Sequence, residues 1–187
     1  MGAGRTELAM SIFGKSYGEN IRGQIFMDGK EVHFPNVKAA IKNKIAYVTE
    51  DRKGNGLILS ESISKNTTAA NLERISKNYV IDFDKERQYS QEMVKEVHTK
   101  CSSVDEDVGN LSGGNMQKVL LGKWLFAQPD ILILDEPTRG IDVGAKYEIY
   151  CIINEMVSNG KSVIMISSEM PELLGMCDRI YVMNEGR

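Results

Sequence analysis

Seven residues, from Ile131 to Pro137, limit the possible fold more strongly than any other stretch of the chain. Four apolar residues in a row are followed by Asp135, Glu136 and Pro137. The run is too short for a buried helix and lacks polar alternation, which is typical of a strand covered on both faces in a parallel sheet. Open α/β sheets place their ligands at the carboxyl ends of such strands. The sequence therefore predicts an α/β fold with two carboxylates at a ligand-binding edge.

A second pattern lies just before this strand, at residues 110–118. Ser112 is followed by two glycines, and apolar residues recur at helical spacing from Val119 onward. A Ser-Gly-Gly turn that opens a helix presents free backbone N–H groups and the positive end of the helix dipole to an anion, most often a phosphate. The alternative is an ordinary helix N-cap beside a flexible turn. The two carboxylates that follow favour the phosphate-binding interpretation.

Together these motifs closely resemble the nucleotide-binding domain of ABC transporters. The resemblance rests on Leu111-Ser112-Gly113-Gly114, on the 131–137 strand and on the turn at 138–142. It extends over essentially all 187 residues. Longer strings resemble, more narrowly, the second of two fused ATPase domains in bacterial importers of monosaccharides such as ribose, xylose and galactose; they lie at residues 113–118, 136–146 and 167–172.

The resemblance implies a RecA-like P-loop NTPase core with an antiparallel β part and a helical subdomain. It implies one domain, 1–187, in which about 60–115 form the helical subdomain that carries the Ser-Gly-Gly turn, while 1–55 and 116–187 form the α/β core. Residues 60–109 are polar and without a central-strand pattern, and they predict a long amphipathic helix from Asp84 to about Lys100. An insertion of this size without sustained heptads argues against the DNA-repair and chromosome-maintenance ATPases, which carry long coiled coils there.

Composition places the chain among ordinary globular proteins. A content of 42% hydrophobic and 26% charged residues predicts a folded chain, and 187 residues suffice for one domain. A net charge of −3 gives no support for nucleic-acid binding. No apolar run approaches the ~20 residues that span a bilayer, so membrane association is expected to come through a partner. The three cysteines lack metal-ligand spacing and indicate free thiols in a reducing compartment.

The N-terminal residues Gly2-Ala3-Gly4-Arg5-Thr6 form a glycine-rich turn that leads into an apolar-periodic segment. Such a turn before a helix is the arrangement that cradles phosphates. As a Walker A loop, Gly4-Arg5-Thr6 matches the final Gly-Lys-Ser/Thr, with arginine in place of lysine. The first glycine of that motif and the preceding strand are missing, so the resemblance implies a chain truncated at its N-terminus.

Local patterns predict the remaining elements. Alternating residues around Asp28-Gly29 predict a hairpin over 24–34. A short helix is expected at 37–43, a strand at 45–48, a helix at 146–157, a strand at 162–166, a short helix from Pro171 and a last strand at 179–183.

The resemblance assigns roles at an ATP·Mg²⁺ site. Asp135 and the Thr6 hydroxyl are expected to hold Mg²⁺, and Glu136 is expected to act as general base on the attacking water. Asp142 corresponds to the aspartate that reaches across a dimer interface. The nucleotide-binding set is completed by Gly2, Gly4, Arg5, Thr6, Ser112, Gly113, Gly114 and Gln117. In this fold the Ser-Gly-Gly turn contacts the γ-phosphate of nucleotide that the opposite domain holds.

Three positions depart from the family pattern. Arg5 replaces the Walker A lysine, and a planar guanidinium is a poor substitute for a compact ammonium. Glu50 stands where most relatives have a glutamine that contacts Mg²⁺ or the attacking water, and Ser168 stands in the place of the switch histidine. Glu136, Glu50 and Ser168 are therefore the expected catalytic residues. Because of the three departures, the site is expected to hydrolyse ATP slowly or not at all.

The sequence thus predicts an ATP-binding half-domain that energises sugar import and completes a partner's ATP site. Its expected partners are a second ATPase domain, fused or separate, membrane permease subunits and, indirectly, a periplasmic or lipoprotein sugar-binding protein. Its expected location is peripheral, at the cytoplasmic face of a bacterial membrane. Two alternatives remain open: a stand-alone, slowly hydrolysing homodimeric ATPase, and a non-catalytic scaffold that docks on membrane subunits.

Overall fold

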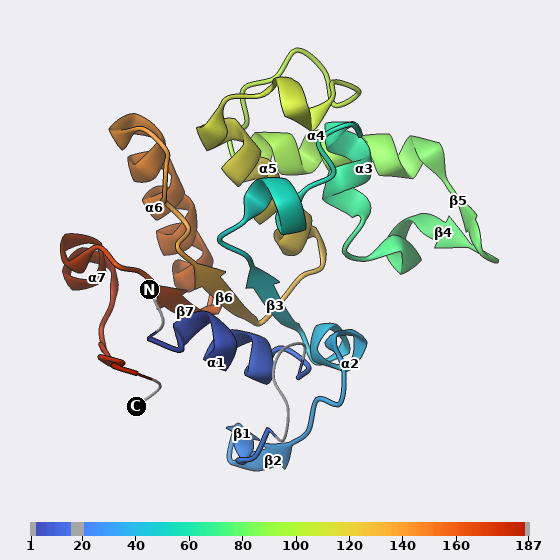
Figure 1. The fold of residues 1–187 in the computed structure, drawn as a ribbon. Helices are drawn as coiled ribbons and strands as arrows, with labels where there is room; N and C mark the ends of the chain where they lie inside the picture. The colour runs from blue at the N-terminus through green and yellow to red at the C-terminus, as the bar shows by residue number, and fades with distance from the viewer. Residues whose placement is uncertain (1–2, 16–20, 186–187) are drawn as a thin grey trace.

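The central sheet forms where the sequence predicts its buried strands. A computed structural model describes residues 3–15 and 21–185 of the chain. Three strands run parallel in the order β3 (Ile45–Val48), β6 (Ile131–Asp135) and β7 (Ser162–Ile166) (Figure 1). Their register pairs Val48 with Leu134 and Asp135 with Ile166. The carboxyl ends of all three strands therefore meet at one edge.

Alternation along the strands divides the core into two clusters. Tyr47 and Ile133 face the side covered by α1 (Arg5–Ile12) and α2 (Val37–Lys42). Val48, Leu132 and Leu134 face the side covered by α5 (Gly113–Phe126) and α6 (Val143–Ser158). Helices thus lie on both faces of the sheet, which explains why β3 and β6 are apolar throughout rather than alternating (Figure 1). The edge strand β7 is less well covered, and Ile164 is 47% exposed.

The N-terminal half contains the predicted hairpin. Strands β1 (Ile25–Met27) and β2 (Lys30–Val32) pair antiparallel around Asp28 and Gly29. Both turn residues have positive φ, 50° and 75°, which a two-residue primed turn requires. After β3, residues Arg52–Gly56 form a single π-helical turn.

The segment before α5 is helical, as the sequence predicts. It contains α3 (Ile63–Thr68) and α4 (Phe83–Glu96), joined by the small antiparallel pair β4 (Ser76–Lys77) and β5 (Val80–Ile81). Short 3₁₀ turns occupy Leu72–Ile75 and Val108–Asn110. Figure 1 shows α3, α4 and α5 gathered on the side of the molecule away from the β1–β2 hairpin. The division of the chain at about residues 60 and 115 stays a prediction.

Helix α4 ends four residues earlier than the predicted limit near Lys100. Val97 closes the helix, and His98 adopts a left-handed conformation with φ of 52° that a helix cannot continue. The prediction of helices after β6 and β7 is confirmed by α6 and by α7 (Met170–Met176).

The predicted last strand at 179–183 is wrong. These residues form no strand, and no described strand lies beside them. Tyr181 and Val182 are 79% and 81% exposed. A β-strand exists only through hydrogen bonds to a neighbour, so an apolar β-branched sequence without one stays irregular.

No helix in the described part of the chain is both long and apolar enough to cross a membrane.

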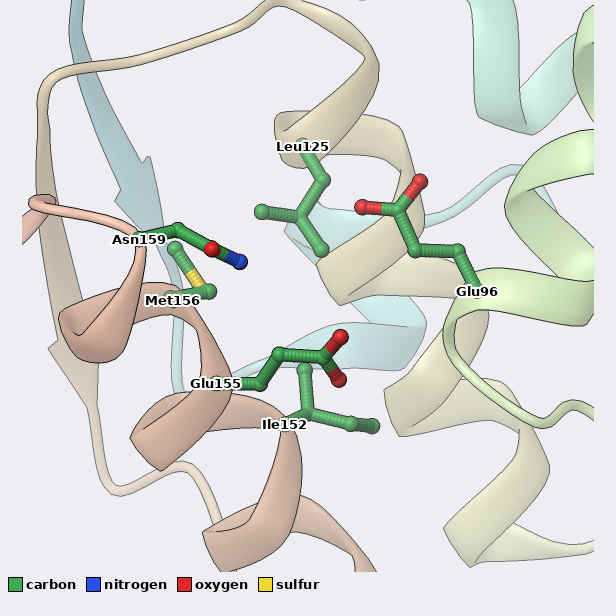
Figure 2. A pocket seen from close by; sticks show the side chains of 6 residues that line it. All are labelled: Glu96, Leu125, Ile152, Glu155, Met156 and Asn159. Carbon is green, nitrogen blue, oxygen red and sulfur yellow. The ribbon is translucent and has the colours of Figure 1, made fainter.

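A small pocket of about 40 Å³ lies at the junction of the helical segment and the core. Figure 2 shows Glu96 at the end of α4 and Glu155 on α6, with Leu125 of α5 between their helices. Burial raises the pKa of the Glu96 carboxyl, and the negative charges of Glu155 and Glu92 raise it further. Ionised Glu96 therefore opposes folding at neutral pH.

Replacing Glu96 with glutamine is expected to stabilise the chain at pH 7–8 and not below about pH 4. A raised carboxyl pKa favours the folded state only where the group is protonated, and this contribution is lost as pH rises through the folded pKa. Because Glu96 is partly exposed, the expected gain is only about 0.5 kcal/mol, or about 1–2 °C in Tm. Thermal melts at both pH values test this, with the exposed Glu73→Gln as control. A gain that is equal at both pH values would contradict the explanation.

Candidate nucleotide site

The carboxyl end of β6 places a buried aspartate beneath the N-terminus of α1. Asp135 is 1% exposed, and its Oδ2 accepts hydrogen bonds from the Thr6 hydroxyl and the Tyr47 hydroxyl, both at 2.8 Å. Its Oδ1 is buried and has no hydrogen-bond partner among the described residues. Burial raises the pKa of Tyr47, and the hydrogen bond to Asp135 raises it further, so Tyr47 stays a proton donor. Asp135 therefore has one oxygen that accepts two hydrogen bonds and one without a partner in the described part of the chain.

This arrangement fits a hard divalent cation. Mg²⁺ takes oxygen ligands and retains several waters, so a site with one carboxylate and one hydroxyl is sufficient when phosphates supply the rest. The unpartnered Oδ1 of Asp135 and the adjacent Thr6 hydroxyl are the atoms that would hold it, directly or through water.

Glu136 follows in a backbone conformation that turns the chain out of the strand. Its φ is 48°, in the left-handed region that is rare for a residue other than glycine. Its N–H donates to the Ile166 carbonyl at 2.8 Å, which holds this conformation against the end of β7. The carboxylate, 9% exposed, accepts a hydrogen bond of 3.1 Å from the Ser168 hydroxyl. The structure therefore brings together two of the three predicted catalytic residues.

Arg5, in the place of the Walker A lysine, points toward the Glu136 carboxylate. Its Nη1 donates to the Ser167 carbonyl at 2.8 Å, and its Nη2 lies 3.8 Å from Glu136 Oε1. Gly4 precedes it as the N-cap with φ of 82° and, being a glycine, supplies no side-chain cap to α1. The first backbone N–H groups of α1 are thus open to an anion, while the arginine charge is directed to protein groups. The predicted contribution of Gly2 lies outside the described residues.

The Ser-Gly-Gly turn forms the N-terminus of α5, as predicted. Ser112 is the N-cap, and its hydroxyl oxygen accepts from the backbone N–H and the side-chain amide of Asn115, at 3.4 and 3.0 Å. Ser112 is exposed, whereas Gln117 is 2% exposed and its side-chain nitrogen has no partner among the described residues. Of these two predicted nucleotide-binding residues, Ser112 therefore lies at the surface and Gln117 inside.

The two glycines of this turn differ in their surroundings. A Cβ at Gly114 would lie 2.6 Å from the Ala145 Cβ, so this position cannot carry a side chain without displacing α6. A Cβ at Gly113 would meet nothing closer than 3.4 Å. Asp142 caps α6 by accepting from the Ala145 N–H at 2.9 Å, and it lies exposed beside the Ser-Gly-Gly turn. Asp142 and the turn therefore lie side by side, with Ser112 and Asp142 exposed and Gly114 buried.

Glu50 pairs with a residue outside the predicted catalytic set. Its carboxylate forms an ion pair with Arg139 in the turn after β6. Its predicted catalytic role is untested and stays a prediction.

Three residues of the site region have no motif that would have identified them. Tyr47 occupies an inward position of an apolar strand, where a core aromatic and a hydrogen-bond donor look alike in sequence. Arg52 reaches backbone carbonyls 87 residues away or more, and Glu172 on α7 accepts from the Thr138 hydroxyl at 2.6 Å. Such contacts depend on tertiary packing, and no local spacing predicts them.

Known proteins share both the sequence and the fold. The sequence profile described as ABC transporter matches residues 1–139. The chain is 62% identical over its full length to an L-arabinose transport ATP-binding protein of Geobacillus stearothermophilus and covers 36% of it. It is 51% identical to a ribose import ATP-binding protein of Bacillus cereus and 52% identical to a xylose import ATP-binding protein of Geobacillus kaustophilus, covering 37% of each.

Solved structures of ATP-binding cassettes have the same architecture. The dimeric MJ0796 cassette bound to ADP and phosphate superposes with a TM-score of 0.79 at 17% identity, over 98% of this chain and 78% of that one. The cbiO1 protein of Clostridium perfringens gives a TM-score of 0.77 at 25% identity, over 100% and 71%. The predicted fold class, an α/β P-loop NTPase, is confirmed. The chain spans little more than a third of the length of its curated relatives. With its profile match, its Ser-Gly-Gly turn and its Asp135–Glu136 strand end, the chain belongs to the ABC transporter family.

Proposed function

We propose that this chain is the second of two fused ATP-binding domains of a bacterial monosaccharide importer, and that it completes the ATP site of the first domain. The observation that carries the proposal is an asymmetry within one chain. The Ser-Gly-Gly turn is complete at the start of α5, with Ser112 exposed and Gly113 half-buried, whereas Arg5 in the phosphate loop is directed to Ser167 and Glu136. Two motifs of such different quality serve two different nucleotides.

The relatives support the class of substrate. Proteins that transport or import arabinose, ribose and xylose are 62%, 51% and 52% identical to the chain over all its residues. The shared coverage of only 36–37% of their length is consistent with one half of a tandem protein. A five- or six-carbon monosaccharide is therefore the proposed cargo, with permease subunits and a sugar-binding protein as the other components, at the cytoplasmic face of the membrane.

The chain's own site is proposed to bind MgATP and hydrolyse it slowly. Bound Mg²⁺ would neutralise charge on the phosphates. The open N–H groups of α1 would bind the phosphates, and Thr6 and Asp135 would hold the cation. Glu136 would orient the attacking water, and the Ser168 hydroxyl, 3.1 Å away, would orient Glu136. Serine cannot accept and return a proton at neutral pH as histidine does, so this position supplies orientation without acid–base exchange.

The purified chain is expected to release phosphate from ATP far more slowly than the ~10 s⁻¹ typical of enzymes. Two departures account for this: Arg5 is held by protein groups, and Ser168 replaces a histidine. Steady-state phosphate release measures it, with Glu136→Gln as the control that removes any genuine turnover. A normal rate that Glu136→Gln abolishes would reject the proposal.

One observation favours a second candidate, a slowly hydrolysing homodimer. Asp135, Glu136 and Thr6 have the geometry expected of a working site, and MJ0796 is a dimer in its solved structure. Concentration-dependent hydrolysis by the chain alone, inhibited by Gly113→Asp, would support the homodimer over the tandem protein.

A further inference from the structure

The loop after β3 is built around a rigid π-helical turn. Asp51 caps the turn by accepting from the Gly54 N–H at 2.9 Å, and the N–H groups of Gly56 and Leu57 bond back to the carbonyls of Asp51 and Arg52. These bonds fix the backbone of Arg52 and therefore the direction in which its side chain leaves the loop.

The Arg52 guanidinium reaches two successive carbonyls of the turn between β6 and α6. Its Nη1 donates to the Arg139 carbonyl at 2.9 Å, and its Nη2 donates to the Gly140 carbonyl at 3.3 Å. Gly140 has φ of 68°, a conformation that an L-residue with a side chain rarely adopts. The turn thus presents both carbonyls in the orientation that one planar fork can bind.

The same guanidinium lies close to Gly113, the second residue of the Ser-Gly-Gly turn. A Cβ built at Gly113 lies 3.4 Å from Arg52 Nη2 and 3.7 Å from the Gly140 carbonyl oxygen. Arg52 therefore lies where three segments meet: the π-helical turn, the 139–142 turn that ends in Asp142, and the N-terminus of α5. Its buried Nε has no hydrogen-bond partner among the described residues.

We infer that Arg52 is a positioning residue that fixes the 139–142 turn against the Ser-Gly-Gly turn and so gives the dimer-facing surface its shape. The inference rests on the proposed function, because that surface matters only if it closes over a partner's nucleotide. Arg52 acts through Asp142 and Gly113 and is not expected to touch nucleotide itself.

The nearby ion pair between Glu50 and Arg139 does not explain how the 139–142 turn is held against the Ser-Gly-Gly turn. Glu50 and Arg139 are 40% and 54% exposed at their side chains, and such surface pairs contribute little because solvent screens them. Arg52 instead binds backbone carbonyls, so its effect does not depend on which side chain occupies position 139. A lysine at position 52 lacks the planar fork and would hold the two carbonyls less well.

The test uses the full transporter reconstituted with its permease, with MgATP as ligand. Arg52→Ala is expected to lower kcat for ATP hydrolysis about tenfold, which corresponds to about 1.4 kcal/mol. The Kd for ATP is expected to stay within about twofold, because nucleotide capture belongs to the partner's phosphate loop. Arg52→Lys is expected to give an intermediate kcat. Lys53→Ala, on the same turn and exposed, is the matched control and should leave kcat unchanged.

Two results would overturn the inference. One is a kcat for Arg52→Ala equal to that of Lys53→Ala. The other is a loss of kcat that comes with a clearly lower Tm or a weaker Kd, since that would indicate a general structural role. Gly113→Asp measured in parallel separates this inference from the proposed function. If Gly113→Asp leaves hydrolysis intact, the proposed function fails; if Gly113→Asp abolishes it and Arg52→Ala has no effect, only the role of Arg52 is rejected.

Discussion

Replacing Gly113 with aspartate in the assembled transporter is expected to reduce ATP-driven sugar uptake at least about 100-fold. The new carboxylate would stand at the half-buried N-terminus of α5, where the partner's γ-phosphate is proposed to bind. In a water-poor interface, the repulsion between this carboxylate and the γ-phosphate amounts to roughly several kcal/mol, even at an intermediate effective dielectric. Uptake into proteoliposomes, with ATP binding measured in parallel, tests this. ATP should still bind, because the turn contributes to closure more than to capture.

The mutant chain itself is expected to fold. A Cβ at Gly113 has ordinary contacts, and an acidic residue in the first turn of a helix interacts favourably with the helix dipole. Gly113→Asn is the matched control, since it adds the same shape without the charge and should retain far more uptake. Arg5→Ala should also retain much of the uptake, because Arg5 belongs to the slow site. If Arg5→Ala were as damaging as Gly113→Asp, the proposed division of labour between the two sites would be wrong.

Much of the fold follows from short-range patterns in the sequence. The strands β3, β6 and β7 are predicted because each is a short apolar run, and the Asp28-Gly29 hairpin because its turn needs positive φ at both residues. The 179–183 segment has equally good strand residues, yet it forms no strand in the structure. Strand propensity describes how a residue fits a sheet, and it does not supply the neighbouring strand.

The residues of the candidate site likewise fall into those that local patterns predict and those that depend on tertiary contacts. Residues at strand ends, such as Asp135 and Glu136, are predictable because parallel strands deliver them to one edge. Ser168 follows β7 and meets Glu136 for that reason. Glu50 also follows a strand, but its carboxylate pairs with Arg139, which lies far away in the sequence, and no local pattern contains that information. The residues that hold the site in shape, Tyr47 and Arg52, likewise act through contacts formed only on folding.

Glu172 is a buried acceptor that links the turn after β6 to the residue that follows β7. It is 6% exposed, and it accepts from the Thr138 hydroxyl at 2.6 Å and from the Ser167 hydroxyl. Thr138 and Ser167 are themselves 1% and 5% exposed, so water cannot replace a lost acceptor easily. Ser167 in turn precedes Ser168, which contacts Glu136. The carboxylate therefore supports both the fold and the geometry of the candidate catalytic pair.

Glu172→Ala is expected to cost about 3 kcal/mol of the free energy of unfolding, and so to lower Tm by about 6–12 °C. The reason is that two buried hydroxyls lose a charged acceptor at once. Glu172→Gln should cost clearly less, because the amide keeps one carbonyl acceptor and hydroxyls rotate to use its other group. Glu169→Ala is the matched control: it removes a more exposed carboxylate nearby, whose ion pair with Lys146 is worth less than about 1 kcal/mol.

Thermal and urea melts of the three variants measure the difference. Equal losses in Glu172→Ala and Glu169→Ala would show that burial and hydrogen bonding at Glu172 do not set its contribution. A large loss in Glu172→Ala alone, half recovered by glutamine, would show that this carboxylate stabilises the fold by linking Thr138 to Ser167.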